Sequence, residues 1–175
     1  MIDQSNIAEL NKIVKQMVVP GKGILAADES TGTIGKKFEK INLPNEEANR
    51  QAYREMLFTS PGIGEYISGV ILYDETIRQS AADGKSFVSI LQSAGVLPGI
   101  KVDQGTASDP ASTNEKITKG LEGLAERLME YVSLGAKFAK WRAVITIAEG
   151  LPTQQNIAQN ARDLAQYALE CQKAG

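Results

Sequence analysis

Histidine is absent from this 175-residue chain. Without it, no Ser-His-Asp or Cys-His mechanism can be assembled, and no zinc site can use imidazole ligands. Any nucleophilic or acid–base chemistry must therefore fall to lysine, carboxylate, tyrosine or cysteine side chains. The single cysteine, Cys171, excludes a disulfide within the chain and fits a reducing compartment. We therefore expect a cytoplasmic protein, or a plastid protein if a transit peptide has been removed.

Long apolar runs and runs of like charge are also missing. No segment approaches the ~20 apolar residues of a membrane-spanning helix, and residues 1–5 lack the basic-then-apolar pattern of a signal peptide. The chain has 19 lysines and arginines against 21 aspartates and glutamates, and no basic run marks a nucleic-acid surface. We therefore expect neither a membrane nor a nucleic acid as a partner.

What the sequence does contain is a repeated strand–helix pattern. Apolar residues at helical spacing between residues 3 and 18 predict an N-terminal helix. Four short apolar runs then predict strands of a parallel sheet, at residues 23–27, 67–73, 99–103 and 137–142. The long polar stretch after residue 103 predicts a loop. Four such units form either a small doubly wound sheet or half of an eight-stranded barrel, and we expect residues 1–175 to form a single domain.

Two helix starts are marked by capping residues. Asn45 precedes Glu46 and Glu47 and is expected to cap the helix that follows. Thr153, after Pro152, is expected to cap the last helix, which ends near the C-terminus.

Charged side chains gather where the predicted strands end. Asp28 follows the first strand, Lys101 and Asp103 end the third, and Lys140 and Arg142 end the fourth. Residues two apart on a strand share a face, so the members of each pair lie together. An ion pair or a charge reaching water explains any one of these positions. Their presence together at the carboxyl edge of a parallel sheet indicates a functional site.

The two cations of the fourth strand need an anionic partner. Lys140 and Arg142 share one face with Phe138, and Trp141 with the apolar residues after it predicts that this strand is buried. Buried cations cost several kcal/mol each unless a partner or ligand compensates for lost hydration. Clustered lysines have lowered pKa values and can act as acid, base or amine nucleophile, and cations of this kind also bind phosphate.

The turn after the first strand adds hydroxyls near a helix start. Ser30, Thr31 and Thr33 supply them, and Gly32 and Gly35 allow backbone N–H groups to approach an anion. The turn matches neither a P-loop nor a dinucleotide fingerprint. A plain helix cap explains it equally well.

Four stretches, taken together and in this order, carry a family resemblance. They are GKGILAADESTG at 21–32, GVIL with ET at 69–76, GIKVD at 99–103 and FAKWR at 138–142. From about residue 7 onward the chain resembles class I fructose-1,6-bisphosphate aldolase. The resemblance implies a (β/α)8 TIM barrel, of which this chain supplies an N-terminal helix and about the first four βα units. It also implies the glycolytic and gluconeogenic reaction, in which fructose 1,6-bisphosphate is cleaved reversibly to dihydroxyacetone phosphate and glyceraldehyde 3-phosphate through a Schiff base, with no cofactor and no metal.

The resemblance assigns roles to eight residues. It implies that Asp28 handles the substrate hydroxyl during carbon–carbon cleavage and that Lys140 assists imine formation. Its substrate- and phosphate-binding positions are Ser30, Thr33, Lys37, Arg50, Lys101 and Arg142. Lys37 stands where the family usually has arginine, whose planar fork a lysine cannot reproduce. The family's Schiff-base lysine and its glutamate acid/base belong to later strands, past Gly175.

Two functions remain open. In the first, the chain is the N-terminal half of an aldolase that binds a sugar-phosphate substrate but does not turn over alone. Its unpaired strand edges then favour a homo-oligomer, or association with the missing C-terminal half. In the second, the chain is a non-catalytic half-barrel that binds sugar phosphates or pairs with a complementary half.

Overall fold

Four parallel strands form the main sheet of the computed structural model, which describes residues 4–175. They are β1 (Gly23–Ala27), β2 (Ile67–Leu72), β3 (Leu97–Lys101) and β6 (Phe138–Lys140). Their order across the sheet, β1–β2–β3–β6, is also their order along the chain. A doubly wound sheet reverses its strand order at a switch point. The sequential order therefore identifies the sheet as an arc of a barrel.

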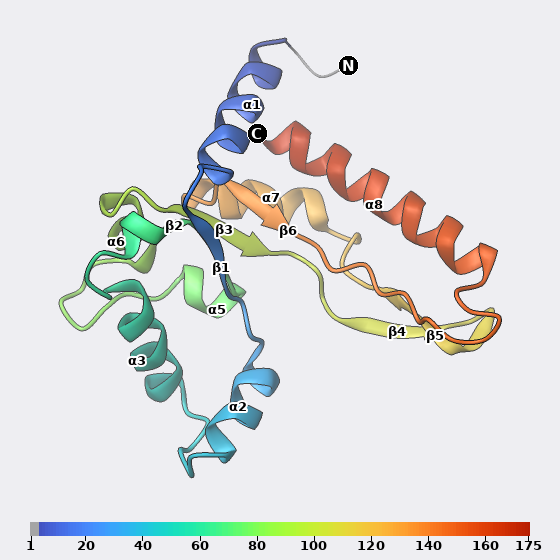
Figure 1. Ribbon diagram of the computed structural model, residues 1–175, viewed down its shortest axis with the longest axis horizontal. Coiled ribbons are helices and arrows are strands. Elements are labelled where there is room, and N and C mark those ends of the chain that lie inside the picture. Colours follow the sequence, from blue (N-terminus) through green and yellow to red (C-terminus); the bar gives the residue numbers. More distant parts are fainter. Residues whose placement is uncertain (1–3) are drawn as a thin grey trace.

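Helices connect these strands, as predicted. They are α1 (Gln4–Met17), α2 (Thr31–Glu39), α3 (Glu47–Phe58), α4 (Ile63–Tyr66), α5 (Asp74–Ile77), α6 (Phe87–Ser93), α7 (Leu124–Ser133) and α8 (Gln154–Ala174). The single-turn helices α4 and α5 are missing from the predicted pattern because four residues are too few to show a helical period. Helix α1 and the end of α8 lie on the same side of the sheet (Figure 1). Among residues 4–175, no helix is long and apolar enough to cross a membrane.

The hydrophobic core lies between the sheet and the helices α6 and α7. Successive strand residues point to opposite faces, and the outward-facing Val70, Leu72 and Ile100 are at most 1% exposed. They belong to one cluster with four helical residues, Phe87, Leu91, Leu124 and Leu128. The inner face of the sheet carries the charged residues at the strand ends. The outer face of the sheet thus packs in the core, and the inner face carries the charged side chains.

The two predicted helix caps have different outcomes. Thr153 is the N-cap of α8 and accepts a hydrogen bond from the Asn156 amide at 3.1 Å, which confirms that prediction. The prediction for Asn45 is wrong, because α3 begins at Glu47 with Glu46 as its N-cap. The side chain of Asn45 instead donates to the Thr31 carbonyl at 3.0 Å and thereby ties α3 to the start of α2.

The polar stretch after β3 forms a β-hairpin where the sequence predicts a loop. β4 (Thr106–Asp109) pairs in antiparallel fashion with β5 (Ser112–Thr118), and this hairpin reaches away from the main sheet (Figure 1). Glu115 accepts hydrogen bonds from the Thr153 amide at 3.0 Å and hydroxyl at 2.7 Å, and Asp109 accepts one from Asn156 at 2.9 Å. Hydrogen bonds from residues 153 and 156, rather than an apolar face, hold the hairpin. Its strands therefore lack the alternating apolar pattern by which strands are predicted.

The carboxylates of this hairpin predict acid sensitivity. Burial alone raises the pKa of Glu115, but the hydrogen bonds from Thr153 outweigh it and hold the pKa below its ordinary value of 4.5. The Asn156 amide likewise lowers the pKa of Asp109. A carboxyl group with a depressed folded-state pKa stabilises the fold above its unfolded-state pKa, and this contribution is lost as pH falls through the folded-state value.

We therefore expect the free energy of unfolding, measured with urea, to fall as pH drops below about 4.5. Glu115→Gln should make this fall shallower because it removes one of the titrating groups. Glu122→Gln, at an exposed position, is the matched control and should leave the slope unchanged. An equal pH dependence in wild type and Glu115→Gln would show that Glu115 does not lock the hairpin.

Two glycines make room for Phe138 on the inner face of the sheet. A Cβ atom at Gly99 would lie 2.3 Å from the Phe138 ring, and one at Gly69 would lie 3.0 Å from it. Glycine within a strand often marks such a close approach. The ring of Phe138 thus lies over β2 and β3, where side chains of other residues would stand.

We expect Gly99→Ala to lower the free energy of unfolding by about 1–3 kcal/mol, the usual cost of overpacking. Urea denaturation measures the change. Gly23→Ala is the control because no atom lies within 4 Å of the added Cβ. In a Phe138→Ala background the cost of Gly99→Ala should shrink, and an undiminished cost would rule out the ring as its cause.

Candidate active site

A polar cavity of about 770 Å³ opens at the carboxyl ends of the four strands. The residues that line it include Asp28, Ser30, Thr33, Tyr73, Asp74, Lys101, Asp103, Arg127, Tyr131, Lys140 and Arg142. Six of the eight predicted site residues are therefore brought together. This edge of a barrel is where active sites lie in the fold.

The pairing of β3 with β6 sets two lysines side by side. Lys101 and Lys140 occupy partner positions in the register of these strands. Residues at partner positions on parallel neighbours point to the same face. Both ammonium groups therefore face the cavity.

Each of the two lysines has a carboxylate partner. The Nζ atom of Lys140 lies 2.7 Å from Asp28 Oδ2, and that of Lys101 lies 2.7 Å from Asp103 Oδ1. Lys101 also donates to the Asp103 carbonyl at 2.6 Å. The protein itself thus supplies the anionic partner that the sequence requires for Lys140.

The fourth strand is less buried than predicted. The side chain of Lys140 is 30% exposed, and Arg142 is exposed beyond the end of β6. Within the described residues 4–175, β6 is an edge strand of the sheet and no carboxylate lies within ion-pair distance of Arg142. Its guanidinium at the cavity rim is therefore available to an anionic ligand.

The turn after β1 is both a helix cap and part of the cavity wall. Ser30 is the N-cap of α2 and accepts a hydrogen bond from the Thr33 amide at 3.4 Å. The hydroxyl oxygens of Ser30 and Thr33 lie 3.1 Å apart, and both residues line the cavity. The capping interpretation is confirmed, and it places two hydroxyls at a helix N-terminus, where anions are favoured.

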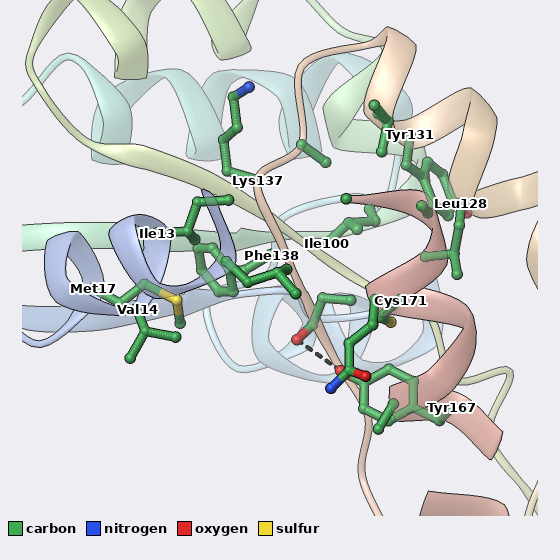
Figure 2. Close-up of a pocket in the computed structure, with 18 residues that line it drawn as sticks. Ile13, Val14, Met17, Ile100, Leu128, Tyr131, Lys137, Phe138, Tyr167 and Cys171 are labelled. Carbon is green, nitrogen blue, oxygen red and sulfur yellow. Dashed lines mark hydrogen bonds between the residues drawn. The ribbon is translucent and has the colours of Figure 1, made fainter. Parts of the chain in front are cut away.

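A second, apolar groove of about 370 Å³ lies beside β6. Figure 2 shows its walls, with Ile13, Val14 and Met17 on α1 and Tyr167 and Cys171 on α8. Its dashed line marks the hydrogen bond from the Tyr167 hydroxyl to the Ala139 carbonyl, 2.8 Å long.

This groove offers little for catalysis. Burial raises the pKa of the Cys171 thiol to about 11, so the thiol stays protonated near neutral pH and is a poor nucleophile. Among residues 4–175, no three cysteines or carboxylates are grouped as metal ligands. The charged groups that can take part in chemistry gather in the polar cavity.

Comparison with known proteins decides the family. Residues 9–175 match the model of fructose-bisphosphate aldolase class-I. The chain belongs to the class I fructose-bisphosphate aldolase family. It is 54% identical over 167 residues to cytosolic fructose-bisphosphate aldolase 5 of Arabidopsis thaliana, and 51% identical over 170 residues to a probable class 1 aldolase of Xanthomonas campestris. These matches cover 95% and 97% of the chain, and 47% and 51% of the relatives.

The fold of the chain is also that of a solved aldolase structure. A solved structure of fructose-bisphosphate aldolase from Plasmodium falciparum, in complex with TRAP and a small-molecule inhibitor, superposes with a TM-score of 0.97 at 46% identity. The match covers 99% of this chain and 50% of that one. The chain thus spans about half the length of the aldolases it matches, and it supplies an N-terminal helix and the first four βα units of the aldolase TIM barrel.

The two other residues expected in an aldolase site do not line the cavity. Lys37 on α2 has a side chain that is 54% exposed and forms an ion pair with Glu29. Arg50 on α3 donates from Nε and Nη2 to the two carboxylate oxygens of Glu75, at 2.8 and 2.6 Å. Substrate binding by either residue stays a prediction.

Several aldolase cavity residues were not predicted. Asp74 comes two residues after the end of β2, much as Asp28 comes directly after β1, so its position near a strand end was a usable signal. Tyr131 donates a hydrogen bond to Asp74 at 2.9 Å, and Arg127 donates one to the Val102 carbonyl at 3.0 Å. Both lie on α7, four residues apart, where they look like ordinary members of an amphipathic helix.

Charge substitutions in this aldolase cavity should change its affinity for inorganic phosphate. Asp28→Asn removes a negative charge and should tighten binding, whereas Lys140→Met removes a positive one and should weaken it. We expect about tenfold in each direction, the scale for one charge several ångströms away at an effective dielectric of about 20. Fluorescence of Trp141, the only tryptophan, reports binding because it adjoins Lys140.

Lys85→Met is the matched control for this titration. Lys85 lies outside the cavity, where its exposed side chain pairs with Asp83, so its loss should leave phosphate affinity unchanged. Equal affinities for wild type, Asp28→Asn and Lys140→Met would place the phosphate site elsewhere.

Proposed function

We propose that this chain forms the wall of a class I aldolase site that holds a sugar phosphate and stabilises charge during carbon–carbon cleavage. The reaction is reversible cleavage of fructose 1,6-bisphosphate to dihydroxyacetone phosphate and glyceraldehyde 3-phosphate through a Schiff base. The observation that carries the proposal is the 2.7 Å contact between Lys140 and Asp28 at the mouth of the barrel arc. The names of the Arabidopsis and Xanthomonas relatives support it.

The Asp28–Lys140 pair supplies the proton transfers. Cleavage requires a base that removes the proton from the hydroxyl on the carbon released as an aldehyde, while the bond electrons pass into the iminium group. The carboxylate of Asp28, 12% exposed and directed into the cavity, serves as this base. Lys140 stabilises the carboxylate before the transfer and assists formation of the imine.

The remaining cavity groups bind phosphate. Lys101 and Arg142 contribute positive charge from β3 and from the end of β6, and the guanidinium of Arg142 can bind a phosphate through two donors. Ser30 and Thr33 add hydroxyls at the start of α2. Lys37 and Arg50 take part only if a phosphate displaces their carboxylate partners.

We further propose that the chain is a single domain that does not turn over alone. The Schiff-base lysine and the glutamate acid/base of the family belong to later strands, and the two lysine nitrogens in this cavity are engaged by carboxylates. Productive chemistry then requires association with a C-terminal half, because a homo-oligomer would cover the unpaired strand edges but would lack the same two groups. Names of cytosolic and cytoplasmic relatives from Arabidopsis and pea support a cytoplasmic location.

A second candidate function is a non-catalytic half-barrel that binds sugar phosphates. The observation in its favour is that the cations and hydroxyls suited to phosphate all lie within this one chain. Binding without cleavage, even in the presence of a complementary half, is the property that separates it from the first.

Borohydride trapping tests whether the chain alone has an active amine. The chain is incubated with dihydroxyacetone phosphate and sodium borohydride, and its intact mass is measured. We expect no adduct because neither Lys101 nor Lys140 presents an unengaged nitrogen. A stoichiometric adduct would show that one of them forms the Schiff base, and the proposed inactivity would then be wrong.

Complementation separates the two candidate functions. The chain is mixed with the C-terminal half of the Arabidopsis relative, and cleavage of fructose 1,6-bisphosphate is followed. Activity that appears with wild type and is lost with Asp28→Asn supports the aldolase function. Phosphate binding without any activity in the mixture supports the half-barrel instead.

A further inference from the structure

A fully buried arginine lies behind the cavity wall. The side chain of Arg54, on α3, is 2% exposed and does not line the cavity. Its Nη1 atom is 2.7 Å from Glu29 Oε2, and its Nη2 atom donates to the Glu29 carbonyl at 3.1 Å. Burying a cation is costly unless it is paired. Both partners of the Arg54 guanidinium, a carboxylate and a main-chain carbonyl, belong to Glu29.

Glu29 lies between two residues of the proposed site. Asp28 precedes it and contacts Lys140, and Ser30 follows it and caps α2. Arg54 holds the Glu29 carboxylate and also the carbonyl of the peptide that leads to Ser30. With both points fixed, the backbone of this loop has little freedom to turn Asp28 or Ser30 away from the cavity.

The charge on Glu29 keeps this contact in place. Burial alone would raise its pKa, but the hydrogen bond from Lys37 and the charge of Arg54 outweigh burial and lower it. The carboxylate is therefore ionised at neutral pH, between an exposed lysine and a buried arginine. The Nε atom of Arg54 also lies 3.5 Å from Thr76 Oγ1 on α5, which joins the loops after β1 and β2 to the same side chain.

We propose that Arg54 is a positioning residue of the site, acting through Glu29 to hold Asp28 against Lys140 and Ser30 at the cavity wall. What the site binds rests on the proposed function, whereas the order that Arg54 imposes on the loop does not. The competing explanation is that Arg54 only stabilises the fold, since it also lies 5.2 Å from the centre of the Tyr53 ring.

Arg54→Lys is the discriminating variant. It keeps the positive charge, but a single ammonium cannot reproduce the planar fork that reaches the carboxylate and the carbonyl together. We expect about tenfold weaker binding of dihydroxyacetone phosphate, followed by Trp141 fluorescence, the scale of one lost charge-assisted hydrogen bond. We also expect faster amide hydrogen exchange confined to residues 28–33.

Phe58→Leu is the matched control for lost stability. Phe58 lies one turn further along α3, is 1% exposed and packs against Phe87 with ring centres 5.3 Å apart. It should lower the free energy of unfolding without changing the affinity or the exchange of residues 28–33. Glu29→Gln should speed the exchange of residues 28–33 as Arg54→Lys does, and the double variant should exchange no faster than the faster single variant, because both break the same link.

Two results would overturn the proposal. One is wild-type affinity and wild-type protection of residues 28–33 in Arg54→Lys, even with reduced stability. The other is full additivity of Arg54→Lys and Glu29→Gln in the exchange rates of residues 28–33. If the wild-type chain does not bind dihydroxyacetone phosphate, the proposed function fails for the chain alone. The exchange of residues 28–33 in Arg54→Lys, compared with Phe58→Leu, then decides the role of Arg54.

Discussion

The ion pair between Lys140 and Asp28 joins the two outer strands of the arc. These residues are 112 positions apart in the chain and come from β6 and β1. Strands lie about 4.8 Å apart, so three spacings would separate these strands by about 14 Å in a flat sheet. A lysine and an aspartate that meet at 2.7 Å across this span require the sheet to curve. The charge requirement of the site and the curvature of the barrel are therefore met by one contact.

Ion pairs also join distant segments one layer further out, on α3. Arg50 and Arg54 are one turn apart, and each pairs with a carboxylate from the segment after a strand, Glu75 on α5 after β2 and Glu29 after β1. Cations on the strands are thus paired with acids in the cavity, and acids in the loops with arginines of the helix layer. Loops held in this way can present fixed side chains to a ligand, which lowers the entropic cost of binding.

How far the sequence predicts this arrangement depends on what holds each part. The four strands and the charged residues at their ends were predictable because buried parallel strands are short apolar runs. The β4–β5 hairpin was not, because it is held by hydrogen bonds that Thr153 and Asn156 donate to Glu115 and Asp109 rather than by an apolar face. The role of Arg54 could not be predicted either. An arginine in an amphipathic helix is normally expected on the solvated face, and only the structure shows that Arg54 is buried. Asparagine is a common N-cap residue, but the side chain of Asn45 bonds to the Thr31 carbonyl of α2 instead of capping α3.

The two faces of the sheet separate folding from chemistry. Val70, Leu72 and Ile100 are buried in one cluster with helices of this same chain, so the outer face of β2 and β3 is part of the core. On the inner face, Phe138 occupies space left by Gly99 and Gly69, while Lys140 and Arg142 keep contact with solvent. The attraction between opposite charges becomes stronger as water is excluded. A partner that covers the inner face would therefore strengthen the ion pairs in the cavity. The core of β2 and β3 is thus packed by this chain itself, whereas the strength of the charged site depends on what covers the inner face.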